Sequence, residues 1–380
     1  MLYKIKFILF TIFFFIITSS VCFSQINETW RYYYPEFCDS SSNKLFFRLE
    51  NNNFFKNTEY VNGVEKGYTL LGYTMQPSLM YYAGDNLRLK VGVHLLQYSG
   101  MDKFSEVLPV FSIHARLSEK VDLIMGGLKG DVHHQLIEPI FNSEHQYGRP
   151  IENGIQLLYN SNHLELDAWI DWEQFITHND TKPEKFTAGI SSKFRFTQTT
   201  SDWDLHIPAQ VIITHLGGEI STYEDRVQSL ANLVTGLKGS KKLENGYIEK
   251  IGLSAYLATY KDITKKSPYD FNSGLGLYPT AEFYSKHGVF MLGYWNAKNF
   301  IAPKGSNIFQ SVSSFDEEYY SKNRQLITSK INFTKLFLNQ FKFSLTMETY
   351  YDLRTKVMDY AYGINMVFTP NFFITKIKID

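Results

Sequence analysis

Apolar and polar side chains alternate with a period of two along most of the chain after residue 43. Residues 163–173 are a clear example. One face of this segment carries Leu164, Leu166, Ala168, Ile170 and Trp172, and the other carries Glu165, Asp167, Trp169, Asp171 and Glu173. Because successive side chains of a strand point to opposite faces, this alternation predicts a strand with one apolar and one polar face.

The same pattern predicts sixteen strands, at 44–56, 67–82, 86–99, 104–117, 121–129, 153–160, 163–173, 185–197, 203–215, 227–238, 247–260, 270–284, 287–296, 324–336, 340–352 and 358–379. Most reach the length of about 9–11 residues that lets a tilted strand cross a bilayer. In the last segment, Thr369-Pro370-Asn371 fits either a turn before a separate strand or a bulge in one long strand. We expect the bulge, because proline cannot donate to a ladder. Fourteen or eighteen strands also fit the pattern.

The connections alternate in length. Short links such as 83–86, 118–120 and 161–162 separate longer polar links near 57–66, 100–103, 130–152, 174–184, 216–226, 261–269 and 297–323. Outer-membrane barrels have short periplasmic turns and long extracellular loops. The sequence therefore predicts an all-β fold, a single antiparallel transmembrane β-barrel over residues 44–380.

The start of the chain has the three parts of a secretory signal. Lys4 and Lys6 precede an apolar run at 7–17, and small residues lead to a cut between Ser24 and Gln25. An anchor helix and a lipoprotein cut at Cys22 are the alternatives. We expect residues 1–24 to be a signal peptide and 25–43 a periplasmic segment or plug. The mature chain would keep one cysteine and form no internal disulfide.

Composition supports this class. The net charge is zero, which disfavours nucleic acid as a partner. Aromatic residues make up 16% of the chain and charged residues only 20%. A barrel that shows lipid an apolar band with aromatic girdles has this balance.

The alternation, the turn rhythm, the signal peptide and the last segment, 372–379, together resemble the porin-like outer-membrane β-barrels. Such barrels commonly end on an aromatic residue, whereas this chain ends on Ile379-Asp380. The resemblance implies the cell outer membrane as the location. It also implies outer-membrane lipid, the barrel-assembly machinery and a small polar solute as partners.

The loop that follows the fifth predicted strand is a candidate pore constriction. In porin-like barrels the loop at this place commonly folds into the lumen. Here it carries Asp131, His133, His134, Glu138, Glu144 and Arg149, and we expect these to face Arg88, Lys90, Arg116, Lys193 and Arg195 on the wall. Rings of charged side chains set ion preference in pores. An ordinary, wet external loop is the alternative.

A second candidate is the acidic face formed by Glu165, Asp167 and Asp171, with Trp169 among them. It would attract cations or stack a sugar on Trp169. The alternative is a wet lumen wall with no specific ligand.

The sequence offers little enzymatic chemistry. It has no Gly-x-Ser-x-Gly elbow, and Ser112 with His114 on one strand face is too little for a nucleophile and its base. His133 and His134 are adjacent and would point apart on a strand, so they make a poor metal site. We therefore expect no enzyme activity, no cofactor and no metal.

The resulting hypothesis is a porin-like channel for small solutes. The alternative is a non-conducting barrel that acts as a binding or structural surface protein through its long loops. A lumen packed with aromatic side chains would favour that alternative, and the side chains expected to point inward are Tyr82, Tyr256, Tyr278, Tyr284, Phe290 and Tyr294.

Overall fold

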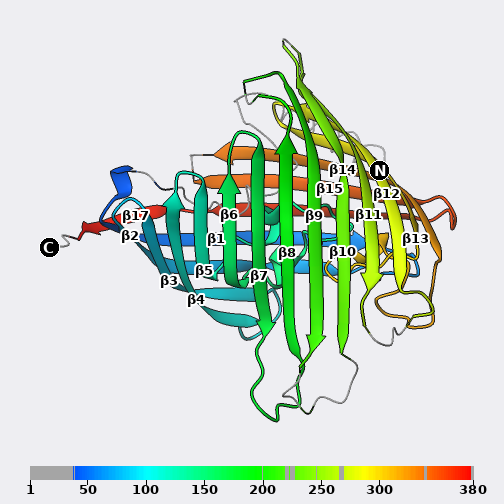
Figure 1. Cartoon of the computed structure of the whole chain (residues 1–380), viewed down its shortest axis with the longest axis horizontal. Coiled ribbons are helices and arrows are strands. Elements are labelled where there is room, and N and C mark those ends of the chain that lie inside the picture. The colour runs from blue at the N-terminus through cyan, green and yellow to red at the C-terminus, as the bar shows by residue number, and fades with distance from the viewer. Residues whose placement is uncertain are drawn as a thin grey trace, which may run out of the picture.

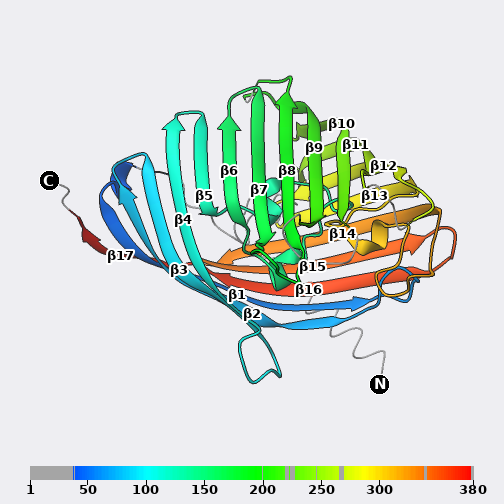
Figure 2. The ribbon, with the colours of Figure 1, turned by 60° about the horizontal axis from the view of Figure 1, so that its bottom comes forward.

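The computed structural model describes residues 37, 39–198, 200–218, 222, 227–244, 246–264, 269–337 and 340–377. They form a closed antiparallel barrel of sixteen strands with one additional short strand (Figures 1 and 2). The strands are β1 Lys44–Glu59, β2 Thr69–Ala83, β3 Leu87–Tyr98, β4 Glu106–Ser118, β5 Val121–Gly127, β6 Asn153–Asn160, β7 Leu164–Gln174, β8 Glu184–Arg195, β9 Trp203–Gly217, β10 Gln228–Lys242, β11 Ile248–Asp262, β12 Ser273–Ser285, β13 Gly288–Lys298, β14 Asn323–Phe337, β15 Phe341–Asp352, β16 Met358–Phe368 and β17 Asn371–Lys376. Short helical turns are η2 Asp39–Ser41, η3 Asp131–His134, α2 His145–Gly148 and η4 Asn307–Phe309. The predicted signal peptide lies outside the described residues.

Closure of the barrel takes place at β1. It pairs with β2 along one edge and with both β16 and β17 along the other, all antiparallel. The last two strands therefore run in the same direction. They are separated only by Thr369 and Pro370, which belong to neither strand. The amide of Leu49 donates to the carbonyl of Pro370 across this interruption, at 3.2 Å. The predicted fold class is confirmed.

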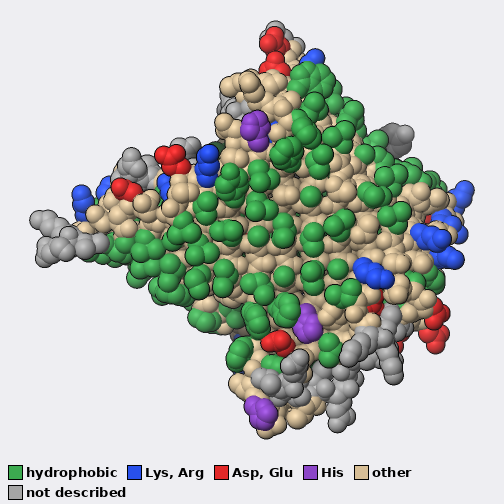
Figure 3. Space-filling model, viewed as in Figure 1, with side chains coloured by type: hydrophobic (Ala, Val, Ile, Leu, Met, Phe, Trp, Pro, Cys, Tyr) green, Lys and Arg blue, Asp and Glu red, His purple; other side chains and the backbone are tan. Residues whose placement is uncertain are grey.

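The outer surface of the barrel is apolar. Large apolar side chains such as Val91, Ile155, Ile190, Leu253 and Leu277 are exposed there. Figure 3 shows hydrophobic side chains spread over one outer face, with charged groups mainly at its margins. Such a surface suits hydrocarbon and would be a liability in water. None of the described helices is long and apolar enough to cross a membrane.

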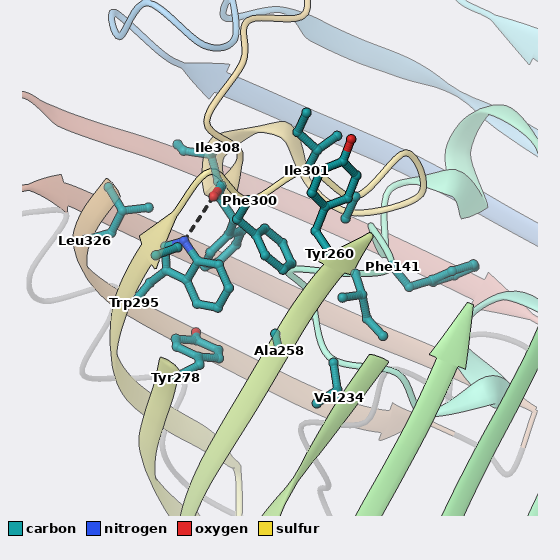
Figure 4. Close-up of a cluster of buried hydrophobic side chains, with 14 of the residues drawn as sticks. Phe141, Val234, Ala258, Tyr260, Tyr278, Trp295, Phe300, Ile301, Ile308 and Leu326 are labelled. Atoms are coloured by element: carbon teal, nitrogen blue, oxygen red, sulfur yellow. Dashed lines mark hydrogen bonds between the residues drawn. The ribbon is translucent and has the colours of Figure 1, made fainter. Parts of the chain in front are cut away.

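The extracellular half of the lumen is filled by an apolar plug. Two long loops, 128–152 and 299–322, contribute Ile140, Phe141, Phe300, Ile301, Ala302, Ile308 and Phe309 to one buried cluster with wall side chains (Figure 4). The wall residue Trp295 is fully buried and its Nε1 donates to the carbonyl of Phe309 at 2.9 Å. The plug and the wall therefore pack as one core.

Four of the six aromatic residues expected to point inward do so. Tyr82, Tyr256, Tyr278 and Tyr284 are buried. Phe290 is instead 38% exposed on the outer face, and Tyr294 lies on that face between buried Gly293 and Trp295. The expectation fails at β13 because this strand is apolar on both faces. Its inner face packs on the plug and its outer face meets lipid.

Replacing Trp295 with alanine should lower the free energy of unfolding by about 3–5 kcal/mol, because a large buried side chain is removed from the plug. The urea midpoint of the protein in detergent micelles, followed by heat-modifiable gel mobility, measures this change. Trp203→Ala is the matched control, since Trp203 is 49% exposed. An equal loss in both variants would contradict a packed plug.

Candidate active site

The loop between β5 and β6 enters the lumen, and His134 fixes it there. The His134 ring is buried and lies between two carboxylates, with Nδ1 2.7 Å from Asp167 Oδ2 and Nε2 2.8 Å from Glu152 Oε2. The ring also stacks on Trp169, with 3.6 Å between centroids. Trp169 is therefore covered by His134, and this face of the indole is not free to stack a sugar.

Three of the other loop residues that the sequence singled out also find partners. Glu144 pairs with Lys56, and Arg149 Nη1 lies 2.8 Å from Glu173 Oε2. Glu138 accepts bonds from the amide and the hydroxyl of Ser143, at 3.2 and 3.3 Å. His133 lines the lumen cavity, and Asp131 belongs to η3.

The five wall cations contact neighbours on the wall. Arg88 bonds His114 (2.8 Å), Lys90 bonds Glu50 (2.7 Å), Arg116 lies 3.9 Å from Asp122, Lys193 pairs with Asp204 (3.2 Å) and Arg195 pairs with Glu165 (2.6 Å). Four of these partners lie on adjacent strands, and Glu50 lies on β1, two strands from Lys90 on β3. Each of these cations therefore has a partner on the wall itself. A role for either set in ion selectivity stays a prediction.

The three carboxylates of the predicted acidic face each have a different partner. Glu165 contacts Arg195, Asp167 contacts His134, and Asp171 Oδ1 accepts the amide of Asn153 at 2.8 Å. Each carboxylate thus has a separate structural role, and their cation binding stays a prediction.

A cavity of about 670 Å³ occupies the periplasmic half of the lumen. Lys120 and Asp122 line it near a periplasmic turn, and His134 and Phe309 line it where the plug begins. The ring of Phe37 packs at this end, 4.8 Å from the ring of His114. Residues 39–43 of the predicted N-terminal segment 25–43 are also described and include η2, whereas residues 25–36 and 38 lie outside the described residues.

Burial and charge set the ionisation of three loop groups. Burial alone would lower the pKa of His134, yet Glu152 and Asp167 raise it to about 10. Burial lowers the pKa of His145 to about 4, and Lys304 adds to this effect. Burial, with Glu144 nearby, raises the pKa of Glu65 to about 7. At neutral pH His134 is therefore a cation that locks the loop, and it cannot serve as a general base.

A different group of residues was missed by the sequence analysis. Three consecutive asparagines interrupt the alternation in the middle of β1. Asn51 and Asn53 lie on the outer face, where Asn51 Nδ2 donates to the carbonyl of Thr74 at 2.9 Å and Asn53 Nδ2 donates to Asn51 Oδ1 at 2.7 Å. Asn52 points inward and is 1% exposed. An uninterrupted alternation would have put apolar side chains at 51 and 53, so this break is the signal that could have revealed the site.

Asn52 belongs to a polar cluster on the inner wall. Thr74 lies directly opposite Asn52 on β2, and the register of β2 with β3 brings His94 close to the same level. Across the closure, Asn365 on β16 lies diagonal to Asn52, and Ser344 on β15 lies opposite Asn365. We call Asn52, Thr74, His94, Ser344 and Asn365 the amide–imidazole cluster.

The hydrogen-bonding capacity of this cluster is largely unused. Both side-chain polar atoms of Asn52, Nε2 of His94 and Oγ of Ser344 are buried and make no hydrogen bond within the described part of the chain. Buried polar groups are normally paired, and unpaired ones are commonly functional. A free imidazole nitrogen can take up a proton, and a free amide can donate to an oxyanion. The cluster therefore contains groups of the kinds that acyl transfer uses, on five neighbouring strands of the inner wall.

No group of three or more His, Cys, Asp or Glu side chains suited to a metal ion occurs over the described ranges. The donors of the amide–imidazole cluster are amides, hydroxyls and one imidazole. This donor set suits hydrogen bonding to a neutral or anionic oxygen.

Comparison with known proteins gives both a family and a fold. The family model described as Lipid A 3′-O-deacylase-type matches residues 37–377. A loop-deletion variant of OmpT, an outer-membrane protein of Vibrio cholerae, is similar over 86% of this chain and 99% of its own, with 12% identity and a TM-score of 0.51. OprD of Pseudomonas aeruginosa is similar over 88% and 98%, with 11% identity and a TM-score of 0.50. No curated protein sequence matches.

These likenesses confirm the predicted outer-membrane barrel. The expectation that the chain is not an enzyme is wrong, because the matching family is one of deacylases. The expectation failed because it looked for a Ser–His pair or a nucleophile elbow. The residues of the amide–imidazole cluster lie on five neighbouring strands, and no local motif links them.

The stability of the barrel should fall as the pH rises toward 10. The folded-state pKa of His134 is raised from 6.5 to about 10, so its contribution is complete below pH 6.5 and is lost as the pH rises through about 10. His134→Gln should lower the stability at neutral pH by about 3–5 kcal/mol, because two largely buried carboxylates lose their cation. It should also flatten the pH dependence. The urea midpoints of the wild type and of His134→Gln, measured from pH 6.5 to pH 10, test this prediction. If the two midpoints change with pH in the same way, His134 does not lock the loop.

Proposed function

Because this chain belongs to the lipid A 3′-O-deacylase-type family, we propose that it is an outer-membrane hydrolase that removes an O-linked acyl chain from a glycolipid of the lipid A type. The reaction adds water to the ester. It breaks the bond between the acyl carbon and the sugar oxygen, and it releases a fatty acid and a free hydroxyl. We place this reaction at the amide–imidazole cluster.

The asparagine triplet of β1 is the observation that carries the proposal. Amide groups on a lipid-facing surface are costly, and polar residues at membrane depth are commonly functional. Asn51 and Asn53 face outward, and Asn52 faces the inner cluster from the same stretch of strand. Polar groups are therefore available on both sides of the wall at one level. Breaks in a local sequence rule are expected at functional sites.

The chemistry assigns a role to each group. The free Nε2 of His94 would take the proton from the attacking water and would return it to the leaving sugar oxygen. The Nδ2 group of Asn52 would donate to the oxyanion of the tetrahedral intermediate. Asn365, held to Tyr147 Oη at 3.1 Å, would orient the substrate side of the cluster.

The membrane setting agrees with such a substrate. The fold and the apolar belt support an outer-membrane location, and acyl chains of the surrounding lipid contact the outer face of β1. The signal peptide and delivery by the barrel-assembly machinery stay predictions.

Replacing His94 with glutamine should lower the deacylation rate by about 100-fold or more, because the general base is lost. Asn52→Ala should lower it by about 100- to 1,000-fold through loss of the oxyanion donor. Release of fatty acid from purified lipid A, followed by mass spectrometry, measures both. His163→Gln and Asn162→Ala, on an exposed turn, are the matched controls. Unchanged rates in both site variants, with an active wild type, would move the site elsewhere.

The sequence also suggested a porin-like channel for small solutes. The plug favours the non-conducting alternative, since loop and wall side chains pack in one buried cluster across the lumen. We expect the folded protein to show no stable conductance steps in planar bilayers. Steady open steps from protein with intact heat-modifiable mobility would reinstate the channel.

A further inference from the structure

Three cations gather around one carboxylate at the extracellular mouth, where β7, β8 and the two plug loops meet. Arg149 Nη1 and Lys185 Nζ lie 2.8 and 3.0 Å from Glu173 Oε2. Lys304 Nζ pairs with the other oxygen, which also accepts the Thr187 hydroxyl at 2.6 Å. We call Arg149, Lys185 and Lys304 the mouth cations.

The mouth cations carry more charge than Glu173 can balance. Three positive groups face one carboxylate in direct contact, which leaves a surplus of two. Glu106 on β4 and Asp171 on β7 also lie within electrostatic range of Arg149 and offset much of this charge from a greater distance. The Glu173 side chain is only 1% exposed, whereas Arg149 is 39% and Lys185 45% exposed. An incoming group therefore meets the cations first.

The same stretches of β7 and β8 mark the membrane boundary. Trp172 and Phe186, the sequence neighbours of Glu173 and Lys185, point to the opposite face, and their rings stack at 5.4 Å. Phe186 also stacks on His215, at 4.9 Å. Aromatic rings of this kind lie at the level of lipid headgroups. The mouth cations are therefore at the height of lipid phosphates.

We propose that the mouth cations bind a phosphate group of an anionic glycolipid headgroup. The guanidinium of Arg149 offers a planar pair of donors to phosphate oxygens, and the lysines add point charges. Arg149 directly follows α2, whose Tyr147 contacts Phe54 with 4.8 Å between ring centroids and accepts a bond from Asn365. The loop that carries Arg149 therefore also contacts the amide–imidazole cluster, through Tyr147. The inference rests on the proposed function for its substrate class.

Binding can be measured apart from hydrolysis. The wild-type barrel and the double variant Arg149→Gln/Lys185→Gln are compared for affinity to a phosphorylated, acylated glucosamine disaccharide, to its dephosphorylated form and to inorganic phosphate. Lys298→Gln is the control, since Lys298 is an exposed lysine at the extracellular end of β13. Heat-modifiable mobility verifies folding of each protein.

The double variant should bind the phosphorylated glycolipid about tenfold or more weakly, because charge-assisted hydrogen bonds are lost. Lys298→Gln should match the wild type. Glu173→Gln should bind more tightly, an effect opposite in sign to that of a merely structural defect. Full competition by inorganic phosphate would assign the site to free phosphate instead of a headgroup. Equal affinity of the double variant, or of the wild type for the dephosphorylated lipid, would overturn the proposal.

The two proposals can fail separately. His94→Gln should bind the phosphorylated glycolipid as the wild type does, because His94 is not a mouth cation. A wild type that binds but does not hydrolyse would remove the proposed activity and leave the phosphate site. A wild type that hydrolyses while the double variant binds equally well would do the reverse.

Discussion

The requirement that every backbone amide and carbonyl find a partner in hydrocarbon governs this molecule. Each unpaired group would cost several kcal/mol, so a sheet in a membrane must close on itself. β1 meets this requirement by pairing with β2 along one edge and with β16 and β17 along the other. Closure of sixteen strands encloses a wide lumen, and the way in which that lumen is filled decides what the barrel can do.

The two halves of the lumen differ in what occupies them. Toward the extracellular side, loop and wall side chains form an apolar core around Trp295 and Phe309. Toward the periplasm, charged groups line an open cavity and pair mostly with neighbours on the wall. Buried ion pairs such as His134 with Glu152 and Asp167 join the two regions. Because buried charges cost free energy unless they are paired, these contacts fix the position of the plug loop.

The sequence predicted the strands well because alternation depends on one local fact, the two faces of a strand in a membrane. The prediction failed where both faces are apolar, as at Phe290 and Tyr294, since alternation then carries no signal. It also could not pair loop charges with their partners: His134 finds Asp167 from 33 residues away, and only the folded chain sets that contact. The amide–imidazole cluster draws on five strands, so only one part of it, the asparagine triplet, is visible in the sequence.

The positions of the side chains in the amide–imidazole cluster depend on the residues that pack against them. Catalytic groups must be held within a fraction of an ångström, and sites on strands braced by packed neighbours achieve this better than sites on loops. Here the plug contributes this support, because Tyr147 packs on Phe54 and bonds Asn365, while Tyr98 Oη donates to the carbonyl of Tyr147 at 2.9 Å. The same loop continues into Arg149 at the mouth. A lumen filled in this way would be a defect in a pore, whereas for the proposed hydrolysis it would hold one wall of the barrel rigid.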